Sequence, residues 1–225
     1  MLKIGHRGAK GHAAENTIAS FQKAIELGVD MIELDVHLSK DGIPVVIHDE
    51  TIDRTTHHSG FVNQFTAEFL QSIGVPSLRD VFDLVENQCA INIEIKVFEA
   101  TKPVLEVLKN AKFPQEKIII SSFDWDVLNV CHCFASSSRA LVSEEQSISL
   151  GVLTEVSIQE ALTFAKKINA YSINPYFKLL NPENVKDIHQ NGFKVFPWTV
   201  NNPDDITFVK SLNVDGIISD FPDRL

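Results

Sequence analysis

Apolar residues in this chain follow two alternating spacings. Short aliphatic and β-branched runs are typical of buried strands, and the segments between them repeat apolar residues every three or four positions, which is typical of amphipathic helices. The runs predict eight strands, at residues 2–5, 31–36, 90–96, 117–121, 150–154, 170–173, 194–199 and 216–219. Helical spacing occurs at residues 17–27, 78–87, 104–111, 158–168, 183–190 and 204–212. Strands that alternate with helices in this way predict an α/β fold, a parallel (β/α)8 TIM barrel.

One segment interrupts the alternation. The apolar run at residues 44–48 follows the second strand after only the short segment 39–43, which is too short for the crossover that a parallel strand needs. Because Asp41-Gly42 is a typical hairpin turn, we expect an antiparallel β-hairpin on the second strand, with Asp35 opposite His48. The polar residues 49–76 are longer than a usual barrel loop and predict a small lid or insertion within a single domain, 1–225. A second irregular connection, the serine-rich residues 135–149, has no evident chemical role.

Composition limits the classes of function. The 225 residues, 44% of them hydrophobic, suit one domain with a large core. A net charge of −10 argues against a nucleic-acid partner and against stable membrane association, so an anionic small-molecule substrate would need local cations. The odd set of cysteines, Cys89, Cys131 and Cys133, fits a cytoplasmic, reducing environment, and we expect all three to be buried. Nothing in the sequence indicates the oligomeric state.

Three acids occupy core-like strands. Glu33 and Asp35 are two residues apart and therefore share a face of the second strand, and Glu94 stands near the end of the third. Their neighbours are aliphatic, and the carboxyl ends of barrel strands are where such folds place their sites. Since three converging carboxylates repel one another without a cation, we predict a divalent metal site. Oxygen ligands suit Mg²⁺ or Ca²⁺ better than zinc.

Cations and histidines accompany the acids. Arg7 follows the first strand, and Lys96 shares the face of Glu94, so both are candidates to bind a phosphate. The alternative is that they only neutralise the carboxylates. His6 and His48 stand at strand ends and could perform the two proton transfers of phosphodiester cleavage, although the sequence does not assign the acid and the base.

Two aromatic residues, Phe123 and Trp198, also fall at strand ends. They could form a wall against a glycerol or an alcohol head group, or simply pack at the rim. His37 shares the alternation of Glu33 and Asp35, but its place along the hairpin predicts exposure to solvent. The remaining histidines, His12, His57, His58, His132 and His189, have no predicted role.

These motifs together resemble the glycerophosphodiester phosphodiesterase family over nearly the whole chain. The N-terminal motifs are His6-Arg7-Gly8, Glu15-Asn16-Thr17, Ile32-Glu33-Leu34-Asp35-Val36, Val46-Ile47-His48-Asp49 and Asp53-Arg54-Thr55-Thr56. The later ones are Val75-Pro76-Ser77-Leu78, Ile93-Glu94-Ile95-Lys96, Ser121-Ser122-Phe123, Trp198-Thr199-Val200-Asn201 and Val214-Asp215-Gly216-Ile217-Ile218-Ser219-Asp220. The chain departs from the family at His12-Ala13-Ala14, where an aromatic, a small residue and proline are usual.

The resemblance implies a phosphoric diester hydrolase of glycerol and lipid metabolism that releases sn-glycerol 3-phosphate and an alcohol. It implies His6 and His48 as the acid/base pair and a metal held by Glu33, Asp35 and Glu94. Arg7 and Lys96 would contact the substrate phosphate.

Two other functions stay as alternatives: a phospholipase D-like or C-like lipid phosphodiesterase, and an inactive barrel that binds glycerophosphodiesters. The acidic net charge argues against the first, and the complete set of site residues argues against the second. The head group, the choice between Mg²⁺ and Ca²⁺, and direct attack by water rather than a cyclic phosphate intermediate are left open.

Overall fold

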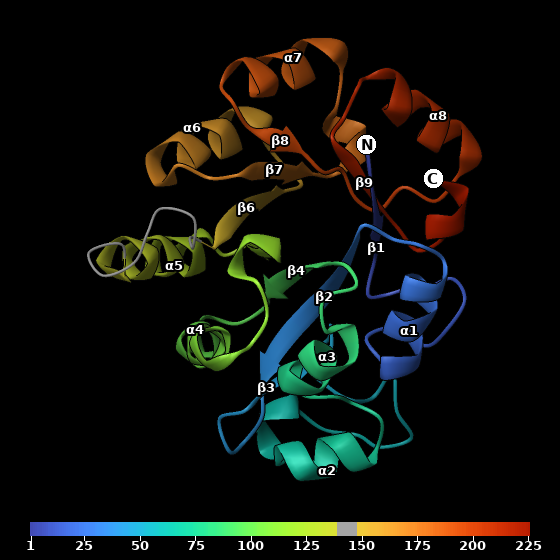
Figure 1. The fold of residues 1–225 in the computed structure, drawn as a ribbon, viewed down its shortest axis with the longest axis vertical. Coiled ribbons are helices and arrows are strands. Elements are labelled where there is room, and N and C mark those ends of the chain that lie inside the picture. Colours follow the sequence, from blue (N-terminus) through green and yellow to red (C-terminus); the bar gives the residue numbers. More distant parts are fainter. Residues whose placement is uncertain (139–147) are drawn as a thin grey trace.

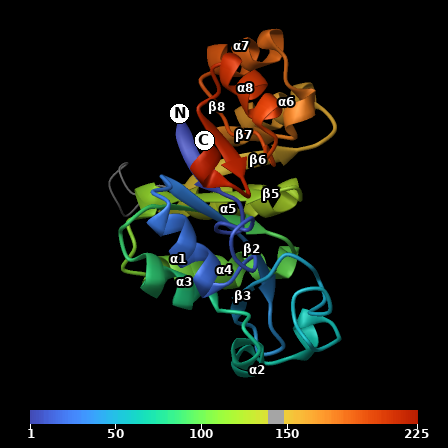
Figure 2. The same cartoon turned by 90° about the vertical axis from the view of Figure 1, so that its right-hand side faces the viewer.

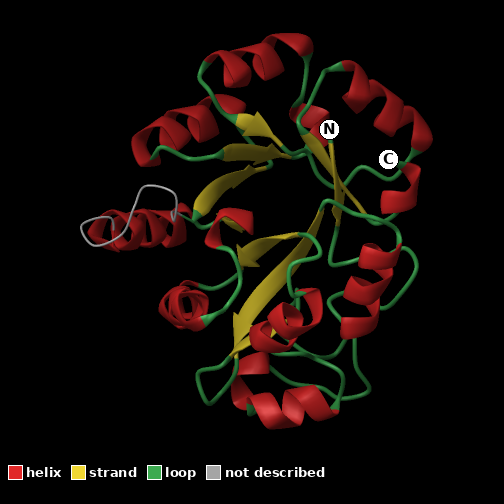
Figure 3. Ribbon diagram, in the orientation of Figure 1, coloured by secondary structure: helices red, strands yellow, loops and turns green. Residues whose placement is uncertain are grey.

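Eight parallel strands lie at the centre of the molecule, and helices surround them (Figures 1 and 3). The computed structural model describes residues 1–138 and 148–225, and of residues 135–138 only the backbone. Along the sheet the strands follow the order β8-β7-β6-β5-β4-β2-β1-β9, with β3 beside β2. The strands are β1 (Leu2–Gly5), β2 (Met31–Leu38), β3 (Pro44–Val46), β4 (Ala90–Ile95), β5 (Ile118–Ser122), β6 (Ser149–Thr154), β7 (Ser172–Pro175), β8 (Lys194–Val195) and β9 (Gly216–Ser219). The predicted TIM barrel is confirmed.

The two edges of this sheet meet through main-chain hydrogen bonds. The Asp215 amide donates to the Val195 carbonyl at 3.1 Å, and the Ile218 amide donates to the Pro197 carbonyl at 3.0 Å. These bonds join the β8 segment to β9. The strand predicted at 194–199 is only two residues long, because Pro197 has no amide hydrogen for the ladder. The strand predicted at 170–173 begins later, since the Ala170 amide still bonds the Ala165 carbonyl at the preceding helix end.

The helices begin where the sequence supplies capping side chains. Thr17, Ser77, Ser157 and Asn181 each accept a hydrogen bond from a first-turn amide, which satisfies a donor that the helix itself cannot pair. The helices are α1 (Ile18–Glu26), α2 (Ala67–Ser72), α3 (Leu78–Val85), α4 (Thr101–Asn110), α5 (Trp125–Ser138), α6 (Ile158–Ile168), α7 (Pro182–Gln190) and α8 (Pro203–Ser211). Each predicted helix is present, with its ends shifted by no more than three residues.

Alternation along β2 divides its side chains between two environments. Ile32, Leu34 and Val36 belong to the large apolar core that includes the helices. Met31 belongs to a small apolar cluster with residues of other strands, Ile4, Ile119, Phe196 and Ile218. Glu33 and Asp35 share the face of Met31, nearer the carboxyl end of the strand. The strand pattern that builds the core therefore also carries two acids to the mouth of the barrel.

The predicted hairpin is present, but its register differs by one residue. Strand β3 pairs antiparallel with β2, and the Ile47 amide bonds the Asp35 carbonyl at 3.0 Å, so Ile47 lies opposite Asp35. The expectation that His48 lies opposite Asp35 is wrong. The turn has three residues, 40–42, closed by the Ser39 amide on the Ile43 carbonyl, and Gly42 takes the left-handed conformation at φ 78°.

Residues 49–76 fold around an apolar cluster of their own. The segment contains a short 3₁₀ helix, Val62–Gln64, and α2, and Figure 2 shows it beside β3 at one end of the molecule. The cluster consists of Val45, Ile47, Ile52, Val62, Ala67, Leu70 and Val75. Because two of these residues belong to the β3 arm, the same cluster that organises the insertion also supports the chain next to His48.

The second irregular connection is only partly described. Residues 135–138 continue α5, so the helix extends further than the serine-rich sequence predicts, and Ser149 already begins β6. The rest of the 135–149 connection lies outside the described residues, apart from Ile148. No helix in the described ranges combines the length and apolar character needed to cross a bilayer.

The three cysteines form no disulfide. Cys89 and Cys131 are buried, as expected, and burial raises the pKa of their thiols to about 11 and about 12. Cys133 is exposed, so the expectation of burial is wrong there. Two residues along an α-helix correspond to about 200° of rotation, which turns Cys133 to the face opposite Cys131.

Candidate active site

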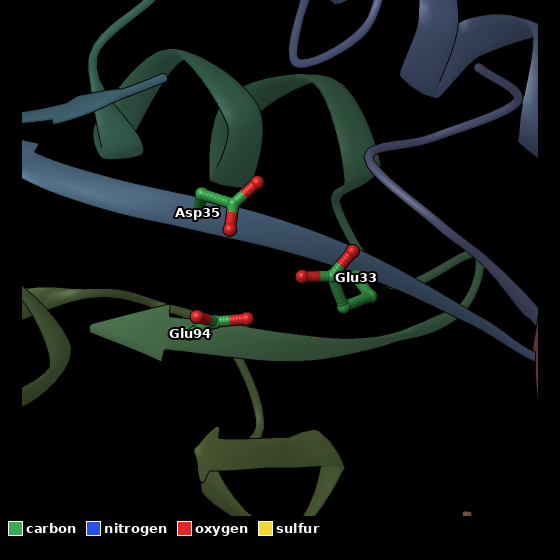
Figure 4. A group of neighbouring side chains, drawn as sticks. All are labelled: Glu33, Asp35 and Glu94. Atoms are coloured by element: carbon green, nitrogen blue, oxygen red, sulfur yellow. The ribbon is translucent and has the colours of Figure 1, made fainter. Parts of the chain in front are cut away.

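Three carboxylates converge at the mouth of the barrel. Glu33 and Asp35 lie on β2 and Glu94 lies on the neighbouring strand β4, with the three side chains close to one another (Figure 4). Parallel pairing sets Asp35 beside Glu94, and one oxygen from each acid lies within 4.8 Å of the others. All three residues are nearly or fully buried, with exposed fractions of 3%, 1% and 9%. Among the described residues this is the group that could hold a metal ion.

Burial and mutual repulsion perturb these acids. Burial, reinforced by the charges of Asp35 and Glu94, raises the pKa of Glu33 well above its ordinary value. Burial and Asp35 likewise raise the pKa of Glu94 to about 7. Burial would also raise the pKa of Asp35, but the charges of Arg7 and Lys96 bring it below its usual value. Glu33 and Glu94, which resist losing their protons, fit a divalent cation, whose charge would favour the ionised form of every ligand.

Arg7 contacts two of these acids and also Glu15. Its amide donates to Glu33 Oε2 at 2.9 Å, its Nε is 3.2 Å from Asp35 Oδ2, and its Nη1 donates to Glu15 Oε1 at 2.6 Å. The turn that presents it is tight, because Arg7 has φ 51° and Gly8 has φ 87°. A Cβ on Gly8 would lie 2.6 Å from the Ser20 carbonyl carbon, so only glycine fits.

Lys96 provides a second cation on the same side. Its Nζ donates to Glu94 Oε1 at 2.5 Å and lies 3.5 Å from Asp35 Oδ1. Burial would lower the pKa of Lys96, but the charges of Glu94 and Asp35 raise it above its ordinary value, so the ammonium stays charged. Its Nζ also lies 5.9 Å from the ring centroid of Phe123, which brings a cation next to an aromatic face.

Each of the two histidines is paired with a carboxylate. His6 Nδ1 donates to Asp220 Oδ1 at 2.6 Å, and His48 Nδ1 donates to Asp49 Oδ1 at 2.6 Å. A carboxylate on Nδ1 fixes the ring orientation and directs proton exchange to the other nitrogen, Nε2. Burial lowers the pKa of both histidines despite these partners. Burial therefore favours the neutral imidazole in both residues, the form that can accept a proton.

The two histidines line one small cavity of about 90 Å³ together with Arg7, Glu33, Glu94 and Lys96. The predicted aromatic residues close another side: the rings of Phe123 and Trp198 meet edge to face, with centroids 5.3 Å apart. Trp198 is fixed by its indole N–H, which donates to the Asn174 carbonyl at 2.8 Å. The structure thus brings the predicted residues into one site, with Asp35 against its edge through Arg7 and Lys96.

Sequence reasoning missed the residues that support this site. Asp220 and Asp49 hold the histidines, and the side-chain Nδ2 of Asn16 donates to Asp35 Oδ2 at 2.8 Å. Asn201 donates to Asp220 Oδ2 at 2.8 Å. Their positions in the sequence could have indicated the two aspartates. Asp49 follows His48 directly, and Asp220 follows the last strand as His6 follows the first.

His37 is buried rather than solvent-facing. Its exposed fraction is 7%, and its Nε2 donates to the His48 carbonyl at 3.1 Å. The expectation of exposure is wrong because the chain at His48 folds back over this end of β2. Two other histidines make pairs away from the site, His12 with Asp223 and His189 with Asp215.

Comparison with known proteins gives a consistent result. A sequence model described as the glycerophosphoryl diester phosphodiesterase family matches residues 6–224. A glycerophosphodiester phosphodiesterase of Caldanaerobacter subterraneus subsp. tengcongensis is 38% identical over 243 aligned residues, which cover 100% of this chain and 96% of that protein.

Solved structures agree. A glycerophosphodiester phosphodiesterase from Thermotoga maritima superposes with a TM-score of 0.82 and 31% identity, covering 99% of this chain and 96% of that one. An Oleispira antarctica phosphodiesterase, solved in complex with the product sn-glycerol-3-phosphate, superposes with a TM-score of 0.84 and 26% identity. That alignment covers 98% of this chain and 93% of the other.

Proposed function

Because the chain belongs to the glycerophosphoryl diester phosphodiesterase family, we propose that it hydrolyses glycerophosphodiesters to sn-glycerol 3-phosphate and an alcohol. One observation carries the proposal: two carboxylate-held histidines line the same cavity as Glu33 and Glu94. Cleavage of a phosphodiester needs two proton transfers and compensation of charge on the phosphate, and this cavity contains groups for both tasks.

Glu33, Asp35 and Glu94 are the proposed ligands of a divalent metal, Mg²⁺ or Ca²⁺. The all-oxygen donor set supports a hard cation. When bound there, such an ion supplies positive charge that favours the transition state of phosphoryl transfer.

Arg7 and Lys96 are the proposed phosphate contacts of the chain itself. Both cations line the cavity, and both are already oriented by carboxylates. Fixed cations stabilise the charge that builds on non-bridging oxygens without having to reorganise during the reaction.

His6 and His48 are the proposed proton-transfer residues. With Nδ1 engaged by Asp220 or Asp49, each imidazole would take up or deliver a proton through Nε2. One histidine would remove the proton of the attacking nucleophile, either water or a neighbouring glycerol hydroxyl group, and the other would protonate the oxygen of the departing alcohol.

Phe123 and Trp198 are the proposed walls for the organic part of the substrate. The net charge of −10, which disfavours binding to an anionic lipid surface, supports a deacylated substrate rather than an intact lipid. We also infer a cytoplasmic location, which the odd number of cysteines in the sequence, three, supports.

The test is release of sn-glycerol 3-phosphate from glycerophosphocholine, with EDTA and with Mg²⁺ or Ca²⁺ restored. Wild type should release the product only with metal, His48→Ala should lose this activity, and the exposed His57→Ala should retain it. Lysophosphatidylcholine micelles serve as the lipid comparison. Faster turnover of the micelles would replace the proposal with a lipid phosphodiesterase, and binding without turnover would indicate an inactive barrel.

A further inference from the structure

Arg54, at the start of the insertion, joins two carboxylates of the site. Its Nε and Nη2 donate to Asp49 Oδ2 and Oδ1 at 2.7 and 3.0 Å. Its Nη1 and Nη2 donate to Glu15 Oε2 and Oε1 at 2.9 and 2.7 Å. The guanidinium thus makes two bidentate pairs, the geometry that arginine forms and lysine cannot reproduce.

Asp49 is the first of these partners and the one that holds His48. Its Oδ1 accepts from His48 Nδ1 and from Arg54 Nη2, while Oδ2 accepts from Arg54 Nε. Arg54 therefore fixes the orientation of the Asp49 carboxylate. The carboxylate in turn fixes the orientation of the imidazole through its hydrogen bond from His48 Nδ1. The hydrogen bonds from Arg54, with that from His48, also lower the pKa of Asp49 well below its usual value, so it remains an acceptor.

The side chains of His48 and Asp49 are only partly enclosed by packing. His48, Glu15 and Arg54 border a cavity of about 430 Å³, and the side chains of His48 and Asp49 are 33% and 28% exposed. A histidine next to open volume can adopt more than one rotamer unless its partner is fixed. The hydrogen bonds from Arg54 therefore restrict these side chains to one orientation, as close packing does elsewhere in the fold.

Glu15 is the second partner, and it connects Arg54 to Arg7. Its Oε1 accepts from both arginines, from Arg7 at 2.6 Å and from Arg54 at 2.7 Å. Glu15 comes from the β1–α1 loop and Arg54 from a segment 39 residues later. The same guanidinium thus ties the insertion to the loop that carries a proposed phosphate contact.

We propose that Arg54 is a positioning residue for the reaction, which acts by holding Asp49 and thereby the imidazole of His48 in the orientation for proton transfer. The inference rests on the proposed function. Arg54 has two conceivable routes of action, and they differ in the kinetic constant that they change. Loss of action through Asp49 and His48 lowers kcat, whereas loss through Glu15 and Arg7 weakens phosphate binding and raises KM.

The test is a double-mutant cycle measured with glycerophosphocholine and saturating metal. The variants are Arg54→Gln, Arg54→Lys, Asp49→Asn and the double variant Arg54→Gln/Asp49→Asn. Arg79→Gln, an exposed arginine on α3, is the matched control. Thermal unfolding of each variant shows whether the fold is retained.

Arg54→Gln should lower kcat about tenfold with KM nearly unchanged, the scale on which supporting partners of a site act. Arg54→Lys should recover only part of the loss, since one ammonium cannot make both bidentate pairs. In the Asp49→Asn background, Arg54→Gln should cause little further loss, because both changes remove the same restraint.

Three results would overturn the inference. The first is a kcat for Arg54→Gln equal to that of Arg79→Gln, and the second is a change in Arg54→Gln that is confined to KM. The third is a loss of kcat in the double variant equal to the product of the losses in Arg54→Gln and Asp49→Asn. Inactive wild type would be a failure of the proposed function instead, so the two failures are distinguishable. Were Arg54→Gln to unfold, folded Arg54→Lys would decide alone: a fall in kcat supports the inference, and full activity contradicts it.

Discussion

Asp35 of β2 lies directly beside Glu94 of β4 in the parallel register, with both side chains buried at the mouth of the barrel. Two acids on neighbouring strands repel each other strongly in such surroundings, and the raised pKa of Glu94 expresses that repulsion together with burial. Arg7 and Lys96 compensate part of the charge. Such a group of buried acids destabilises the fold by itself. It is a reasonable arrangement for residues that bind a cation.

Glu94→Gln should therefore damage activity and metal binding together. A bound cation supplies several kcal/mol of transition-state stabilisation, and at about 1.4 kcal/mol per tenfold change the variant should lose about 100-fold or more in kcat. Metal titration by calorimetry and by activity measures both effects. Glu116→Gln, an exposed acid at the opposite end of the strands, is the control. Full activity of Glu94→Gln with unchanged metal affinity would remove Glu94 from the ligand set.

Phe123→Ala should raise KM with a smaller effect on kcat. The ring is 40% exposed and meets Trp198 at the cavity, so its loss removes contact area for the substrate alcohol. An aromatic contact of about 1 kcal/mol corresponds to a change in KM of roughly fivefold. Val156→Ala, which truncates a side chain 80% exposed, provides the comparison. Equal KM values in the two variants would assign Phe123 to rim packing alone.

Glu15 should make the fold sensitive to acid. Burial would raise its pKa, but hydrogen bonds from Arg54 and the charge of Arg7 lower it from 4.5 to about 2. Because the pKa is lower in the folded chain, the stabilisation is fully present above pH 4.5 and is lost as the pH falls toward 2. At about 1.4 kcal/mol per pKa unit, its size is roughly 3 kcal/mol.

Urea unfolding of wild type and Glu15→Gln at several pH values measures this contribution. The free energy of unfolding of wild type should fall more steeply between pH 4.5 and pH 2 than that of the variant. Parallel curves would show that Glu15 titrates alike in the folded and unfolded chains.

Gly8→Ala and Gly28→Ala form a matched pair. Both glycines have positive φ, 87° and 71°, but a Cβ on Gly8 would meet the Ser20 backbone, whereas nothing lies within 4 Å of one on Gly28. Gly28→Ala should lower the free energy of unfolding by about 1 kcal/mol, because alanine is strained in that conformation. Gly8→Ala should cost more than 3 kcal/mol, because strain at φ and a backbone clash combine. Equal melting temperatures would contradict the clash.

Much of this site follows from the periodicity of strands. Glu33 and Asp35 share a face because side chains alternate, and strand ends converge because all the barrel strands are parallel. The pairing of His6 with Asp220 was beyond such reasoning, since the residues are 214 positions apart and meet only because β9 closes onto β1. The barrel could be predicted, but the side-chain contacts between strands from opposite ends of the chain could not.

The hairpin shows a different limit. Asp41-Gly42 is compatible with a two-residue turn and with a three-residue turn, so the sequence does not determine the turn length. A difference of one residue in the turn shifts the pairing of every β3 residue with β2 by one position. The burial of His37 depends in turn on how residues 49–76 fold over β2, and the polar sequence of that segment carries little periodic signal. Local pattern identified the residues, whereas tertiary packing determined their partners.

One of the two proposed proton-transfer histidines, His6, directly follows the barrel strand β1, while His48 stands beyond an antiparallel arm supported by the small cluster around Ile52 and Leu70. That cluster is separate from the large core beneath the helices. With His48 as a proton-transfer residue, catalysis and folding would depend on different sets of apolar contacts. On heating, the few side chains around the arm should loosen first, and activity would be lost while the eight strands were still paired. Inactivation would then precede melting.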